Sequence, residues 1–75
     1  MAVLQRFRKI RETDQEVQYL FGYPDLDRQL TIDKMARGFA VADGREDHAS
    51  RAVVARVTAR AAAEGAWPGG GAVQS

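Results

Sequence analysis

The chain has 75 residues, a formal net charge of +1 and no cysteine. This length accommodates one small domain and leaves no room for both a core and a deep enclosed pocket. The lack of cysteine excludes disulfide bonds and thiolate-bound metals. No apolar run approaches the roughly 20 residues of a membrane span, and no secretory signal peptide is visible. We therefore expect a small cytoplasmic bacterial protein that does not bind membranes.

Charge is unevenly distributed along the chain. Residues 1–11 carry four basic residues and no acidic one, and residues 12–50 carry nine acidic and four basic ones. Residues 51–75 carry three arginines and one glutamate. Because a local excess of one charge attracts the opposite charge, the basic start and the basic C-terminal part are candidates for contact with an anionic partner.

The clearest strand covers Val17–Tyr23, where apolar residues, three of them aromatic, occupy every second position. This period of two is typical of a strand with one buried face. Pro24 lacks a backbone N–H, so it ends the strand and begins a turn. Strands at Arg28–Asp33 and Phe39–Asp43 alternate in the same way, and we predict that they form a hairpin through a tight connection at Lys34–Gly38.

The second clear element is a helix that follows Asp47 and ends at Gly65. Acidic residues near its start offset the positive end of the helix dipole, and Asp43 or Asp47 can cap its free amides. Gly65 can adopt the left-handed conformation that stops a helix. One face of this helix holds small apolar residues that can lie close to a sheet, namely Val53, Val54, Val57 and Ala61.

Residues 3–12 fit two structures. Leu4, Phe7 and Ile10 have the spacing of a helix. A strand hairpinned to Val17–Tyr23 would instead place Ile10 opposite Val17, Arg11 opposite Glu16 and Arg8 opposite Tyr19. We favour the strand, because opposite charges and an arginine beside an aromatic ring are favourable pairs across strands.

These elements predict an α+β fold, a small antiparallel β-meander of three to four strands with one C-terminal helix packed on one face. We expect the domain to cover residues 1–66. Trp67 is expected to fold back onto the core beside the end of the helix. The proline and three glycines that follow are typical of flexible linkers, so we expect residues 67–75 to be a flexible C-terminal tail.

No catalytic residue, metal site or cofactor is predicted. His48 and Ser50 lie two residues apart on the expected helix and point about 200° from each other, which excludes a hydroxyl–imidazole pair. Asp25 and Asp27 lack the glycine and glutamate that a calcium loop needs at fixed positions. Glycines 69–71 do not lead into a helix N-terminus, as a phosphate-binding loop must. We therefore expect a protein that is not an enzyme.

The predicted fold leaves one face of the sheet without a helix. Antiparallel sheets tolerate a wet face, and they associate through such a face where apolar residues cluster on it. We therefore expect an accessory or regulatory module that binds a protein partner, or a second copy of itself as a homodimer. The residues expected on the interacting face are Phe7, Leu20, Thr31, Ala40 and Ala42.

The alternative is a regulator that binds nucleic acid through its basic residues, since these bind phosphates and a nearby aromatic ring can stack on bases. Its candidate residues are Arg6, Arg8, Lys9, Arg11, Arg51, Arg56 and Arg60. We prefer protein binding, because a dedicated nucleic-acid binder usually has a pI above the 8.2 of this chain. A third reading, an inhibitor whose acidic middle segment masks a basic partner, is not separable from the first by sequence.

Overall fold

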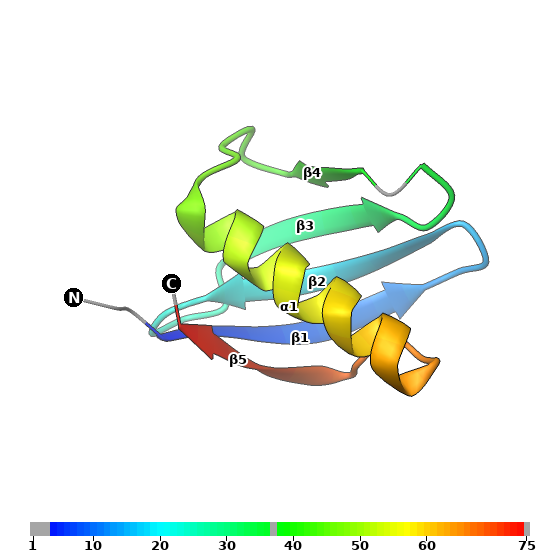
Figure 1. Ribbon diagram of the computed structural model, residues 1–75. Coiled ribbons are helices and arrows are strands. Elements are labelled where there is room, and N and C mark those ends of the chain that lie inside the picture. Colours follow the sequence, from blue (N-terminus) through cyan, green and yellow to red (C-terminus); the bar gives the residue numbers. More distant parts are fainter. Residues whose placement is uncertain (1–3, 37, 75) are drawn as a thin grey trace.

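The computed structural model describes residues 4–36 and 38–74. Within them the elements are β1 (Leu4–Glu12), β2 (Glu16–Gly22), β3 (Arg28–Asp33), β4 (Phe39–Val41), α1 (His48–Glu64) and β5 (Gly70–Gln74). The strands form one antiparallel sheet in the order β4-β3-β2-β1-β5, and α1 crosses one face of it (Figure 1). This confirms the predicted α+β fold, an antiparallel meander with one C-terminal helix. The sheet has five strands, whereas three to four were predicted. Val3, Arg37 and Ser75 belong to predicted segments but lie outside the described residues.

The core lies between α1 and the side of the sheet that faces it. On β2, Val17, Tyr19 and Phe21 are completely buried, as the alternation predicted. The helix contributes Val53 and Val57, which are also completely buried. Burial of apolar side chains of this size stabilises a fold by about 1.5–3 kcal/mol each. The packing of α1 on the centre of the sheet therefore joins the two layers.

Both ends of α1 carry the caps that the sequence predicted. Asp47 is the N-cap, and its carboxylate accepts a hydrogen bond from the Ser50 backbone N–H at 3.0 Å. Gly65 ends the helix in the left-handed conformation (φ 74°), and its N–H donates to the Ala61 carbonyl at 2.9 Å. These bonds satisfy backbone groups that a helix end otherwise leaves without partners.

β1 is a strand, as we favoured, but the predicted register is wrong. Phe7 lies opposite Phe21, one residue away from the predicted pairing, and the register shifts again around Ile10. A slip of one residue turns every side chain of a strand to the other face. Phe7 is therefore in the core, 3% exposed, with its ring packed edge-on against Tyr19. The prediction that Phe7 belongs to the uncovered face is wrong for this reason.

The C-terminal residues complete the sheet. Gly70–Gln74 form β5, which pairs antiparallel with β1, so these residues belong to the domain and the predicted tail is corrected. A Cβ atom on Gly71 would lie 3.0 Å from both Phe7 Cζ and Arg60 Nη1, so glycine provides close packing here. Trp67 packs against the core, as predicted.

The predicted hairpin of β3 and β4 is present, with Leu30 opposite Val41. β4 ends at Val41, two residues before the predicted boundary. The Gly44 N–H donates to the Val41 carbonyl at 2.9 Å, and this turn directs the chain toward α1. Ala42 and Asp43 are therefore outside the strand.

Candidate functional site

One face of the sheet is not covered by any described element. α1 packs on the opposite face, and the side chains that point away from it remain at least partly accessible (Figure 1). We call this side the open face. Strand alternation and register place on it Arg6, Arg8, Arg11, Glu16, Gln18, Leu20, Gln29, Thr31, Asp33, Ala40 and Ala72.

Three of the five predicted interaction residues lie on the open face. Leu20 and Thr31 are partly buried between neighbouring strands, and Ala40 is exposed. Ala42 is exposed just beyond β4, where its N–H donates to the Gln29 carbonyl at 2.8 Å. The open face is thus a flat surface of small and polar side chains, with Leu20 and the 41% exposed Leu4 among its large apolar ones.

A row of arginines runs along β1 on the open face. Arg6, Arg8 and Arg11 are all exposed, and we call them the arginine row. Side chains at alternate positions of a strand stand about 7 Å apart. Arg6 and Arg8 have small cross-strand neighbours at Gly22, Gly70 and Ala72 and a larger one at Leu20, and Arg11 lies opposite Gln18. The structure has a shallow hollow at this place, bounded by Arg6, Arg8 and Leu26, so the guanidinium groups are approachable from the side.

Among the described residues, no acidic group forms an ion pair with the arginine row. Ion pairs in this part of the chain are formed by Lys9, Arg28, Lys34, Arg45 and Arg60, whereas the exposed Arg51 and Arg56 on α1, like the arginine row, form none there. The positive charge of the row is therefore not neutralised within this part of the chain.

The structure divides the predicted nucleic-acid residues between two sides of the sheet. The arginine row is on the open face, whereas Arg51, Arg56 and Arg60 belong to α1 on the other side. Lys9 also points to the helix side, where its Nζ bonds Glu12 Oε1 at 2.8 Å and the Trp67 carbonyl at 3.4 Å. The seven residues therefore do not form one continuous basic surface.

The open face becomes acidic away from the arginine row. Glu16 and Asp33 are register partners at one end of β2 and β3. Gln18 lies between the two charges: its Nε2 donates to Glu16 at 3.2 Å, and its Oε1 accepts from Gln29 at 3.4 Å. The open face is therefore basic along β1 and acidic at its far corner.

A separate charged cluster holds the start of α1. The Arg28 guanidinium lies 4.7 Å from the centre of the Phe21 ring and pairs with Asp43 at 2.9 Å and with Asp47 at 3.0 Å. The hydrogen bond from the Ser50 N–H, followed by that from Arg28, lowers the pKa of Asp47 to about 2. These groups serve helix capping and the attachment of β3 to α1.

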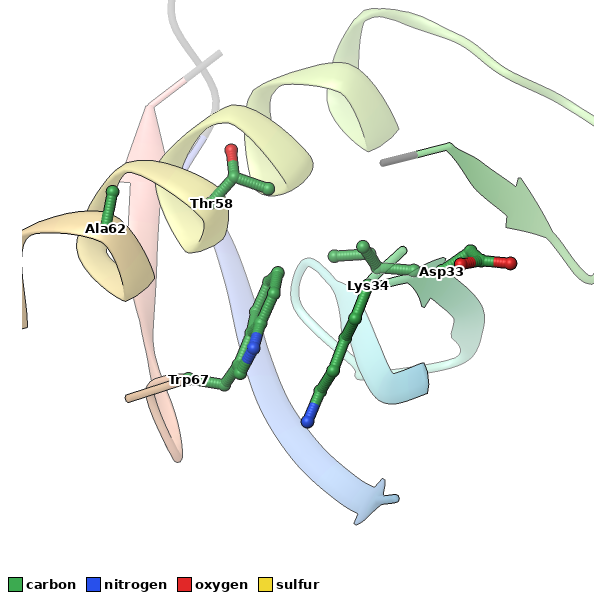
Figure 2. Close-up of a pocket in the computed structure, with 6 residues that line it drawn as sticks. Asp33, Lys34, Thr58, Ala62 and Trp67 are labelled. Carbon is green, nitrogen blue, oxygen red and sulfur yellow. The ribbon is translucent and has the colours of Figure 1, made fainter. Parts of the chain in front are cut away.

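A small cleft of about 180 Å³ lies between β3 and the C-terminal half of α1, lined by Ile32, Asp33, Lys34, Thr58, Ala62 and Trp67. Figure 2 shows the Trp67 indole beside Lys34, with the Asp33 carboxylate turned away from the ring. The polar groups here already have partners. Lys34 Nζ bonds Glu12 at 2.7 Å, and the Thr58 hydroxyl donates to the Val54 carbonyl at 2.8 Å. Lys34, and then Lys9, keep the pKa of Glu12 below its usual range.

The hydroxyl of Ser50 has a structural role and does not face His48 as a catalytic pair. The Ser50 hydroxyl is completely buried and donates to the Asp47 carbonyl at 2.9 Å, whereas His48 is exposed. Within residues 4–36 and 38–74, no three His, Cys, Asp or Glu side chains are grouped as metal ligands would be. The helix in these residues is neither long nor apolar enough to cross a membrane.

Comparison with protein-family models, curated proteins and solved structures finds no match to this chain. The evidence for the candidate site is therefore the geometry of its residues. The sequence identified the residues of the arginine row but did not place Arg6 and Arg8 beside Leu20. Phe7 is the residue from which this position could have been predicted. When this large apolar side chain is buried in the core, its neighbours Arg6 and Arg8 must point to the opposite face of the sheet.

Proposed function

We propose that this protein is a non-enzymatic interaction module that binds another protein, or a second copy of itself, through the open face. The observation that supports this most directly is the presence of the arginine row, which has no ion partner among residues 4–36 and 38–74, beside Leu20 on a face that no described element covers. Interfaces between proteins commonly combine apolar contacts at the centre with a polar and charged rim.

The composition of the open face fits that arrangement. Leu20 is in register between Arg8 on β1 and Gln29 on β3, so its apolar side chain is surrounded by polar ones. Thr31 and Ala40 continue the face with short side chains, which leave it flat. A domain of this size has a thin core and gains proportionately more from association than a large domain does.

The proposal can be tested by photo-crosslinking in the cells that make the protein. A photo-crosslinking amino acid replaces Thr31 on the open face, and the control carries it at Ala59, an exposed position of α1. We expect a discrete protein adduct from position 31, lost when Leu20→Asp is added, and none from position 59. Sedimentation of the purified protein identifies self-association. Adducts from both positions alike, or from neither, would refute the use of the open face.

The second candidate function is nucleic-acid binding, which the arginine row also favours. Three exposed arginines along one strand can each contact a phosphate, and such binding weakens steeply as the salt concentration rises, because the counterions that binding releases then gain less entropy. This proposal now depends on Arg6, Arg8 and Arg11, since the arginines of α1 lie on the other side of the sheet. Fluorescence anisotropy with a labelled oligonucleotide at low salt tests this second function. If the protein does not bind the oligonucleotide at low salt, nucleic-acid binding is refuted.

A further inference from the structure

We infer that the partner presents an acidic protein surface, with carboxylates that pair with Arg6 and Arg8. This inference rests on the proposed function and names the chemistry of its partner. It starts from the charge of the open face, where the arginine row has no acidic partner within the described residues. An anionic partner surface supplies the opposite charge that the described residues do not supply to the arginine row.

The geometry of the arginine row suits carboxylates. The guanidinium group is planar and can donate two parallel hydrogen bonds to one carboxylate. Arg6 and Arg8 stand about 7 Å apart along β1, the same repeat that alternate side chains of a partner strand would have. The small residues at Gly70 and Ala72 leave room beside the arginines for such a strand or for the side chains of a helix.

Two observations favour an acidic protein over a nucleic acid. First, Glu16 and Asp33 make the far corner of the open face negative, and a uniformly anionic polymer lying across it would be repelled there. Second, the aromatic rings of the strands all lie on the side facing α1, so they are not placed to stack on bases: Phe7, Tyr19, Phe21 and Phe39. Tyr23 is exposed but lies in the loop after β2.

The test compares two variants that remove the same charge from opposite sides of the sheet. R6Q/R8Q changes the open face, and R51Q/R56Q changes two exposed arginines of α1. The probes are a fluorescent tetraglutamate peptide, short enough to lie on Arg6 and Arg8 without reaching Glu16 and Asp33, and a labelled 20-nucleotide oligo-dT, which extends across them; both are measured by anisotropy at equal ionic strength. Thermal unfolding monitored by circular dichroism verifies that both variants keep the fold.

We expect the unmodified protein to bind tetraglutamate more tightly than oligo-dT. R6Q/R8Q should weaken that binding about tenfold, the loss expected when two exposed ion pairs are removed. R51Q/R56Q should leave it within about twofold, because its arginines lie away from the open face. Equal losses in the two variants, tighter binding of oligo-dT, or no binding of tetraglutamate would each overturn the inference.

The same variants separate this inference from the function on which it rests. If the crosslink from position 31 persists in R6Q/R8Q, the open face binds a partner but the arginine row does not select it. If R6Q/R8Q loses the crosslink while R51Q/R56Q keeps it, the inference gains support. A crosslink that joins two copies of this chain and resists salt overturns the acidic partner in favour of self-association.

Discussion

Replacing Asp47 with alanine should destabilise the fold through the start of α1. The Asp47 carboxylate accepts from the Ser50 N–H at 3.0 Å and pairs with Arg28 at 3.0 Å. Removal of an N-cap side chain costs about 1 kcal/mol. The ion pair adds no more than about 0.5 kcal/mol, since over a third of the carboxylate side chain is solvent-accessible. We expect a loss of about 1.5 kcal/mol, or about 6–12 °C in Tm for a domain of this size.

The effect of Asp47 should also depend on pH. Its pKa is about 2 in the folded protein and about 4 in an unfolded chain. The carboxylate therefore contributes its full stabilisation above pH 4, and this contribution is lost as the pH falls toward 2. The difference in unfolding free energy between the unmodified protein and Asp47→Ala should narrow over that interval.

Urea unfolding followed by circular dichroism, at pH 7 and at several values between 4 and 2, measures both effects. Asp47→Asn should lose less than Asp47→Ala at pH 7, because asparagine is also a good N-cap. Glu46→Ala removes a neighbouring exposed charge and should change stability by less than about 0.5 kcal/mol. The reasoning fails if Asp47→Asn and Asp47→Ala are equally unstable, or if the difference from the unmodified protein is independent of pH.

Further predictions concern the contacts that attach the C-terminal residues to the sheet. Tyr19→Phe removes the buried hydrogen bond to the Pro68 carbonyl, which is 2.6 Å long, and should cost about 1–3 kcal/mol in urea unfolding. Burial raises the pKa of Tyr19 to about 12, so stability should decline as the pH rises from about 10 toward 12, and less so in Tyr19→Phe. Gly71→Ala should lower stability by about 1–3 kcal/mol, because its methyl group meets Phe7 at 3.0 Å. Gly69→Ala meets nothing within 4 Å and serves as the control; an equal loss there would contradict the packing argument.

The sequence predicted the elements whose local pattern agrees with their tertiary environment. Buried and partly exposed side chains alternate along β2 from Glu16 to Phe21, and its two aromatic residues, Tyr19 and Phe21, both point into the core. Asp47 and Gly65 end α1 through bonds within a few residues, so their roles could be inferred without knowledge of the rest of the fold. The uncovered face of β2 and β3 followed from the same alternation, and it holds Leu20 and Thr31 as expected.

The errors arose where the pattern is irregular. Phe7 and Ile10 are three residues apart, so no uninterrupted strand can bury both; in the structure Phe7 is buried, whereas Ile10 is 43% exposed where the register shifts. The register that pairs opposite charges looked favourable, yet burial of Phe7 outweighs such surface pairs. β5 was missed because glycine is typical of loops, whereas Gly71 provides the space that Phe7 and Arg60 occupy.

The pairing of β5 with β1 joins segments that are made far apart in time. While the ribosome synthesises the chain, β1 emerges well before β5 and has one side without a neighbour until β5 follows. The sheet is complete only after this contact has formed, and contacts between residues far apart in the sequence form slowly during folding. Until then, charged side chains on the strand oppose its pairing with other nascent chains. Arg6 and Arg8 are among these charged side chains of β1.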